Sequence, residues 1–172
     1  IYPISYRPFD KKFIFYEDKL VWRTVRKVMQ HLMTDENFAL FSLKRARDNF
    51  TSKFGIFKNL IDKSAISSLD NGYVFPLYQY PEITNQENFD FDQLKNLRKP
   101  NLDSNITQKI AENLGLTFIT DHEDEQAGKE GTFHPLDVLD YIYAVLHSPA
   151  YRETYKEFLK IDFPRVPYPT DK

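Results

Sequence analysis

The sequence predicts a mixed α/β (α+β) fold: a small central sheet flanked by helices and followed by a C-terminal helical pair. Four short stretches rich in aromatic and β-branched residues indicate strands, at residues 13–16, 38–43, 54–60 and 73–80. Between and after them, apolar residues recur at the three- and four-residue spacing of helices. Short strands interspersed with helices are typical of this fold class.

The first expected helix lies between the first two strands. Its apolar face would contain Val21, Val25, Val28, Met29 and Leu32, which leaves Arg23, Arg26 and Lys27 on a basic outer face. The last strand contains Pro76, which has no backbone N–H to donate, so this strand is expected to be bent or at an edge of the sheet.

A second helix is expected after an irregular polar connector. Ser104 or Asn105 can cap it, Ile106, Ile110, Ala111 and Leu114 would form its apolar face, and Gly115 is a suitable end. A short strand at 116–119 would follow, and then an exposed loop at 121–131, because that segment is acidic and contains glycines.

The segment "HPLDVLDYIYAVLHSPAYRETY" predicts two consecutive helices. Pro135 suits a first helical turn, and apolar residues around most of the following circumference indicate a largely buried helix. Ser148 and Pro149 would interrupt it in a tight turn, and Tyr151, Tyr155, Phe158 and Leu159 form the stripe of the second helix.

Length and composition predict one domain over residues 1–172. It would contain a basic strand and helix region at 1–81, a variable connector and helix at 82–131, and the helical pair with a proline-rich tail at 132–172. The absence of cysteine excludes disulfides and thiolate sites and favours a reducing compartment, the cytoplasm. No signal peptide or membrane span is recognisable. A chain that begins at Ile1 is expected to belong to a longer protein.

Charge is unevenly distributed along the chain. Residues 1–63 contain 13 Lys/Arg and 7 Asp/Glu, a net charge of +6, whereas residues 64–172 contain 10 and 18, a net charge of −8. This pattern is expected of a surface that binds a polyanion, unless folding interleaves the two halves.

Basic residues in the first third are therefore the candidate DNA-binding site. They form three groups: Arg7, Lys11 and Lys12 beside the first strand; Arg23, Arg26 and Lys27 on the first helix; and Lys44, Arg45, Arg47 and Lys53 between two strands. The groups converge only if the sheet brings them together. We expect the helical group to contact phosphates and the arginines at 44–47 to read bases, because a guanidinium can pair bidentately with guanine.

Most aromatic residues of this region are expected in the core, because they alternate as strand residues do; Tyr6 and Phe9 are the least certain. Arg7 has two open interpretations, a contact with DNA or a structural ion pair with Asp10 inside the "RPFD" turn.

Two catalytic interpretations are weaker. His134, Asp137, Asp140 and His147 contain metal-binding residue types but lack the converging spacing of a zinc or iron site, and His134 suits a helix-capping role. Asp10, Glu17 and Lys19 formally match a metal-dependent nuclease, although "EDK" reads equally well as a turn. We expect no catalytic residue, metal or cofactor within this chain.

The order of motifs resembles the C-terminal specificity region of type ISP restriction-modification enzymes. The resemblance is carried by "YRPFDKKFIFY", "VMQHLM", "NFALFSLKR", "YVFPLYQYP" and "HPLDVLDYIYAVLHSPAYRETYKEFLKIDFPRVPYP" and is loose from 82 to 131. It implies a target-recognition domain that binds double-stranded DNA and lies after an N6-adenine methyltransferase domain, in a bacterial cytoplasmic polypeptide with helicase-like parts. S-adenosylmethionine, ATP and Mg would serve the parent enzyme. The alternative within the same resemblance is a module that docks against those neighbouring domains.

Overall fold

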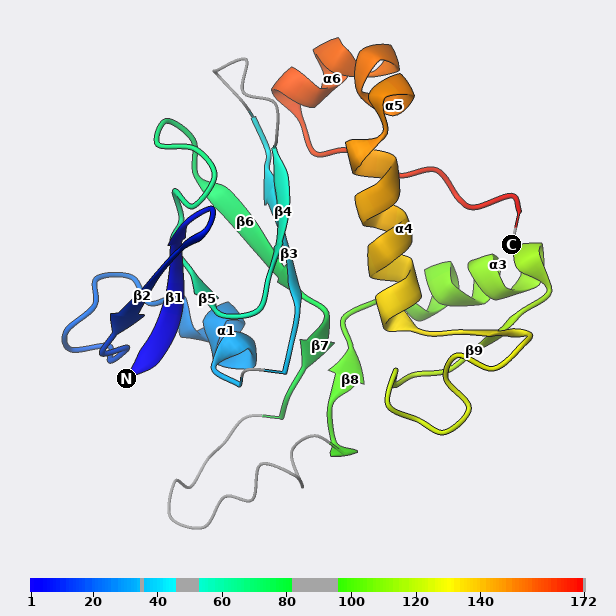
Figure 1. The fold of residues 1–172 in the computed structure, drawn as a ribbon, viewed down its shortest axis with the longest axis horizontal. Helices are drawn as coiled ribbons and strands as arrows, with labels where there is room; N and C mark the ends of the chain where they lie inside the picture. The colour runs from blue at the N-terminus through cyan, green and yellow to red at the C-terminus, as the bar shows by residue number, and fades with distance from the viewer. Residues whose placement is uncertain (35, 46–52, 82–95, 172) are drawn as a thin grey trace. The chain divides into compact units, whose positions relative to one another are not determined.

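The structure is a computed structural model that describes residues 1–34, 36–45, 53–81 and 96–171. These residues form a mixed α and β fold with small sheets, which confirms the predicted fold class (Figure 1). They divide into two compact units: residues 1–76 with 139–167, and residues 77–138 with 168–172. No helix in the described part of the chain is long and apolar enough to cross a membrane.

The first unit contains two three-stranded sheets. One sheet contains β1 (Tyr2–Arg7), β2 (Asp10–Ile14) and β5 (Leu60–Ile61) in the order β2-β1-β5. The other contains β3 (Ala39–Leu43), β4 (Phe54–Phe57) and β6 (Gly72–Pro76) in the order β4-β3-β6. β1 and β2 form an antiparallel hairpin, and β5 runs parallel to β1 at Ile4 and Ser5 alone. The remainder of the hairpin is thus a two-stranded ribbon.

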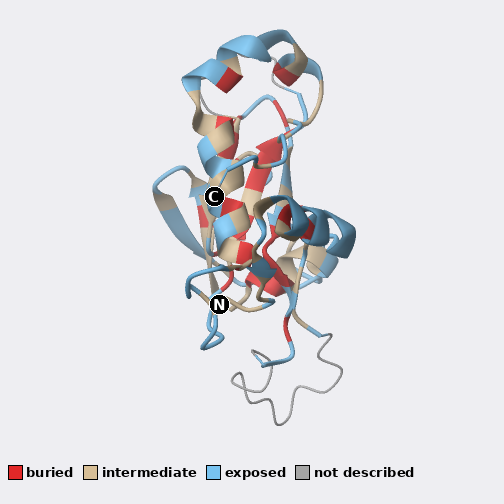
Figure 2. Ribbon diagram, turned by 90° about the vertical axis from the view of Figure 1, so that its right-hand side faces the viewer, coloured by how far each residue is buried: buried red, intermediate tan, exposed pale blue. Residues whose placement is uncertain are grey.

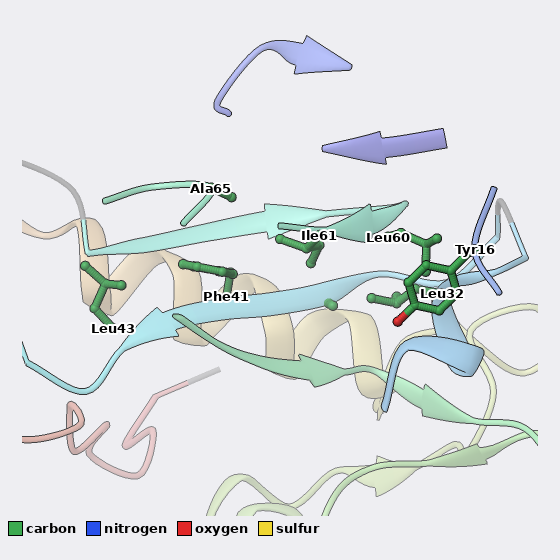
Figure 3. Close-up of a cluster of buried hydrophobic side chains, with 8 residues drawn as sticks. Tyr16, Leu32, Phe41, Leu43, Leu60, Ile61 and Ala65 are labelled. Carbon is green, nitrogen blue, oxygen red and sulfur yellow. The ribbon is translucent and has the colours of Figure 1, made fainter. Parts of the chain in front are cut away.

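The central strand β3 is covered on both faces, as its apolar sequence predicts. Ala39, Phe41 and Leu43 point into one core, and Leu40 packs on the other side of the strand. Figure 3 shows the first core: Tyr16 and Leu32 lie near Leu60 at one end of it, and Leu43 lies at the other.

The second face of this sheet is covered by the C-terminal helices: α4 (Pro135–His147), α5 (Pro149–Thr154) and α6 (Lys156–Ile161). Leu146 of α4, Tyr151 and Leu159 bury against Phe54 of β4, while most of α5 and α6 is exposed (Figure 2). Ser148 caps α5 by accepting a hydrogen bond from the Tyr151 N–H, so the turn between helices lies where predicted. The expected pair is three helices, because a short break at Tyr155 separates α5 from α6.

The first expected helix is much shorter than predicted. Between Val21 and Leu32, where this helix was expected, the chain is helical only in α1 (Arg26–Met29) and the 3-10 helix η1 (Gln30–Leu32). Arg23 and Val25 adopt left-handed backbone conformations, which end any helix before Arg26. Val21, Thr24 and Val25 are β-branched and therefore weak helix formers, so apolar residues at helical spacing were not enough to form a helix here.

The second unit contains β7 (Tyr78–Gln79), β8 (Lys99–Pro100), α3 (Ser104–Leu114), β9 (Thr117–Phe118) and β10 (Thr132–Phe133). α3 ends at Gly115 as predicted, in a left-handed conformation, but its cap is Asp103, whose carboxylate accepts from the N–H groups of Asn105 and Ile106. The stretch expected as one strand at 73–80 is split into β6 and β7 immediately after Pro76.

Candidate nucleic-acid interface

The tip of the β1–β2 hairpin presents cations around one aromatic ring. Arg7 and Asp10 are paired across the hairpin, so only residues 8–9 form the turn. The Arg7 guanidinium lies 4.2 Å from the centre of the Tyr6 ring, and the Lys12 ammonium lies 4.0 Å from it. These cation–π contacts hold both charges at the tip without neutralising them.

The ion pair between Arg7 and Asp10, one of the two interpretations of Arg7, does not form. Arg7 Nη1 instead lies 3.4 Å from Asp62 Oδ1, and Asp10 lies 3.7 Å from the Lys12 ammonium. The reason is the parallel pairing of β1 with β5, which brings Asp62 beside the end of β1. All four of these side chains remain partly exposed, so the pairs are surface interactions of small energy.

A second basic group surrounds an open polar pocket of about 360 Å³. The pocket is lined by Lys44 and Arg45 after β3 and by Asp70, Asn71 and Tyr73 at the start of β6. Lys44 and Arg45 are exposed, and no carboxylate among the described residues forms an ion pair with either. Asp70 is buried, with its N–H bonded to the Ser67 hydroxyl.

The tail after α6 supports this pocket. The Phe163 ring packs edge-on against Tyr73 at 5.0 Å between centroids, and the Lys44 ammonium lies 5.8 Å from the same ring. Gly72 is required beside the pocket, because a Cβ there would lie 1.6 Å from an atom of the buried Phe41 ring. The backbone of β6 can therefore approach β3 closely enough to set Asn71 opposite Lys44.

Backbone hydrogen bonds place the hairpin tip and the pocket at the same end of the first unit. The Asp62 N–H donates to the Ser5 carbonyl, the Gly72 N–H donates to the Lys63 carbonyl, and Gly72 pairs with Leu43 in the next strand. This chain of contacts links the strand end beside the hairpin tip to the end of β3 that precedes Lys44. The sheets thus bring together two of the three expected groups.

The helical group lies elsewhere. α1 and η1 precede β3, near the end of the sheet opposite to Lys44 and Arg45 (Figure 1). Arg26 Nε donates to Asp18 at 3.1 Å and its Nη2 to the Tyr16 carbonyl at 3.4 Å, whereas Lys27 is exposed. The Arg23 guanidinium lies over the Trp22 ring at 4.6 Å.

Lys53 and Arg47 are the other two basic residues that were predicted between the strands. The Lys53 ammonium donates to the Leu159 carbonyl in α6, so this side chain connects β4 to the C-terminal helices. Arg47 lies outside the described residues.

Phe13 and Phe15, at the end of β2 away from the tip, are exposed, although most aromatic residues of this region were expected in the core; the exposed Phe9 was one of the two uncertain positions. Phe9 is fully exposed at the turn, and Phe13 and Phe15 are 78% and 59% exposed. β2 is an edge strand of its sheet, so nothing in its sheet covers its outer side. Alternation in the sequence identified a strand but did not show which of its faces is covered.

Comparison with known proteins supplies the family. A family model described as the Type ISP C-terminal specificity domain matches residues 1–172. The chain belongs to this family. No curated protein matches it.

Two solved structures share the fold of this specificity domain. One is a cryoEM structure of a DrdV–DNA complex, with 22% identity and a TM-score of 0.64, covering 97% of this chain and 14% of that one. The other is the ATP-dependent Type ISP restriction-modification enzyme LlaBIII bound to DNA, with 20% identity and a TM-score of 0.66, covering 96% and 9%. The specificity domain therefore spans only a small part of these larger chains.

The two units of the specificity domain retain the charge separation of the sequence. The first unit contains 17 Lys/Arg and 12 Asp/Glu, a net charge of +5, and the second contains 6 and 13, a net charge of −7. Basic and acidic residues therefore remain concentrated in different units. The basic candidate groups all belong to the positively charged unit.

The acidic loop of the second unit is anchored by a buried arginine. The side chain of Arg98 is inaccessible to solvent and forms two hydrogen bonds with the Asp121 carboxylate, at 2.5 and 2.6 Å. Burial is the largest influence and would lower the pKa of Arg98, but the hydrogen bonds and charges of Asp121 and Tyr80 together outweigh it and raise this pKa. Likewise burial would raise the pKa of Asp121, and the bond from Arg98 lowers it. This pair is structural.

The histidines also have structural partners. At the start of α4, the backbone N–H of Asp137 donates to His134 Nδ1 at 3.4 Å, and the backbone N–H of His134 donates to Asp137 Oδ2 at 2.8 Å. This reciprocal pattern is that of a capping box, in agreement with the predicted capping role of His134. His147 contacts Arg152 at 3.1 Å and stacks on Tyr143. No group of three or more potential metal ligands occurs in the described part of the chain.

The nuclease triad is not assembled. Asp10 begins β2, whereas Glu17 and Lys19 follow its other end, so a strand of about 13 Å separates them. The Glu17 carboxylate accepts a hydrogen bond from the Asp18 N–H, as expected for a turn.

Sequence reasoning did not select Asp70 and Asn71 as site residues. They lie 25 or more positions from Lys44 and reach it only through the pairing of β6 with β3. The signal available was the "DNG" sequence directly before a strand, which is typical of a turn that places polar side chains at a sheet edge.

Proposed function

We propose that this specificity domain recognises a sequence in double-stranded DNA and orients it for adenine methylation by a neighbouring domain of the same polypeptide. The observation that carries the proposal is the pocket of Lys44, Arg45, Asp70 and Asn71, in which exposed cations adjoin hydrogen-bonding groups of both polarities. The family and the two DNA-bound structural neighbours support it.

The pocket has the chemistry needed to read base edges. A guanidinium such as that of Arg45 can pair with guanine O6 and N7, and an amide such as that of Asn71 can pair with adenine N6 and N7. The Lys44 ammonium suits a phosphate, which fixes register without reading sequence. Lys11, Lys12 and Arg7 at the hairpin tip extend the cationic surface.

Arg26 and Lys53 are weaker candidates for DNA contacts, because Arg26 is bonded to the Asp18 carboxylate and Lys53 to the Leu159 carbonyl. Arg23 and Lys27 remain candidates for phosphate contacts at the other end of the unit. In this proposal the chain itself catalyses nothing, and S-adenosylmethionine, ATP and Mg serve other parts of the enzyme.

The test is binding of the complete polypeptide to two fluorescent duplexes, one selected from a random pool and one random. Arg45→Ala and Asn71→Ala should reduce the preference for the selected duplex by about 5- to 150-fold, the value of one bidentate base contact of about 1–3 kcal/mol. Lys58→Ala is the matched control, since Lys58 is exposed and follows β4 at the opposite end of the sheet. A preference unaffected by Arg45→Ala and Asn71→Ala would exclude this pocket as the reader.

A second candidate function, docking to neighbouring domains of the polypeptide, is favoured by one exposed apolar loop. Leu20, Trp22 and Val25 are 69%, 82% and 57% exposed. Scattered apolar residues are ordinary on a surface, but three in six positions including a tryptophan form a patch suited to a protein interface. Trp22→Ser should then lower the thermal stability of the complete polypeptide and leave the affinity for DNA unchanged.

A further inference from the structure

Phe9 has a backbone conformation that is unfavourable for a bulky side chain. It lies at the second place of the two-residue turn between β1 and β2, with φ = 66°. Bulky residues rarely adopt this left-handed backbone, which suits glycine or asparagine. The ring is also fully exposed, so no burial within the domain compensates for the strain.

The surroundings of the ring are cationic. Arg7, Lys11 and Lys12 lie within three positions of Phe9, and two of them are held over the Tyr6 ring. Cores of protein interfaces are depleted of lysine and other charges, so this tip is poorly suited to a protein partner. A ring projecting between cations suits a polyanion whose charges flank apolar faces.

The end of the hairpin is a two-stranded ribbon. β5 pairs only with Ile4 and Ser5, so the hairpin has no third strand beyond Ser5. Two-stranded ribbons enter the major or the minor groove of DNA, and phenylalanine is among the side chains that proteins bound in the minor groove insert between base steps.

We propose that Phe9 is a wedge that inserts between adjacent base pairs of the bound duplex and unstacks them. Arg7, Lys11 and Lys12 then contact the phosphates on either side. This inference deepens the proposed function and rests on it.

The test uses duplexes selected by binding to the complete polypeptide, with 2-aminopurine placed at successive positions. The fluorescence of this analogue rises when it loses stacking. The wild type should raise it at one or two adjacent positions. Phe9→Asn, which keeps a residue tolerant of φ > 0, should abolish the rise and weaken binding by roughly 10-fold, within the range of one base-stacking contact.

Two variants separate the wedge from a general loss of structure. Phe9→Leu, which retains an apolar wedge, should restore part of the fluorescence rise. Phe15→Asn removes an exposed phenylalanine beyond the other end of β2 and should leave the rise intact. Phe9→Asn should not lower the melting temperature, since it relieves strain and exposes nothing.

The possible failures are distinguishable. If the wild type binds no duplex, the proposed function itself is wrong. If the wild type binds but no position brightens, or if Phe9→Asn brightens the same position equally, DNA recognition stands and the wedge is wrong. If Phe9→Asn leaves DNA binding unchanged and lowers the melting temperature of the complete polypeptide, Phe9 docks against protein instead.

Discussion

Salt dependence provides a quantitative test of which end of the first unit contacts DNA. Lys11, on β2 near the hairpin tip, and Lys44, at the pocket, are exposed lysines at the proposed DNA-binding end. Each phosphate contact adds about 0.9 to the slope of log affinity against log salt concentration, because it releases condensed counterions. The double variant Lys11→Ala/Lys44→Ala should therefore reduce this slope by about 1.8.

The expected effect is large enough to measure. Over a four-fold change of salt, from about 50 to 200 mM, a slope smaller by about 1.8 corresponds to about 12-fold less loss of affinity. Fluorescence anisotropy with a labelled duplex at four or five salt concentrations provides the slope. Random duplex suffices, since phosphate contacts are independent of sequence.

The control removes the same charge from the other end of the unit. Lys19 follows β2 and Lys58 follows β4, both exposed and both remote from the tip and pocket. Lys19→Ala/Lys58→Ala changes the net charge equally, so an effect of overall charge alone would appear in both variants. A slope that falls in this variant and not in Lys11→Ala/Lys44→Ala would place DNA at the α1 end and refute the interface.

Three further results are expected from the structure. Arg98→Met should lower the free energy of unfolding by about 3 kcal/mol in urea titrations, since it leaves the partly buried Asp121 carboxylate without its cation; an effect below about 1 kcal/mol would show the pair to be of the weak surface type. Gly72→Ala should lower the free energy of unfolding by about 1–3 kcal/mol, the range for overpacking, because the new methyl group meets the Phe41 ring. Melting followed by circular dichroism would detect this loss of stability. Burial, and next the charge of Arg98, lower the pKa of His122 below its ordinary value of 6.5, so the unfolded state takes up the proton first. Stability should therefore fall as pH decreases through about 6.5, and a His122→Asn variant should show a flatter profile of melting temperature against pH.

Local sequence signals predicted the elements whose burial or caps are decided locally. β3 is apolar at nearly every position and is buried on both faces, and α4 begins at Pro135 as its sequence indicates. Ser148 begins α5 and Gly115 ends α3, both where expected, because helix capping depends on residues only a few positions away.

The failures have a common physical cause in tertiary context. β1, containing Pro3, was not expected, and it exists because both β2 and β5 pair with it. The helix expected from Val21 was prevented by left-handed Arg23 and Val25, which no apolar spacing encodes. The pocket was likewise not predicted, because Asp70 and Arg45 line it together only through the pairing of β6 with β3.

The charge of the two units also bears on how the domain would approach DNA. A unit of net charge +5 is attracted to the phosphates, and one of net charge −7 is repelled, with fields that extend about one Debye length, roughly 10 Å at 0.1 M salt. Non-specific attraction to the phosphates therefore acts on the first unit, which contains the pocket and the hairpin tip, and it is independent of any base contact.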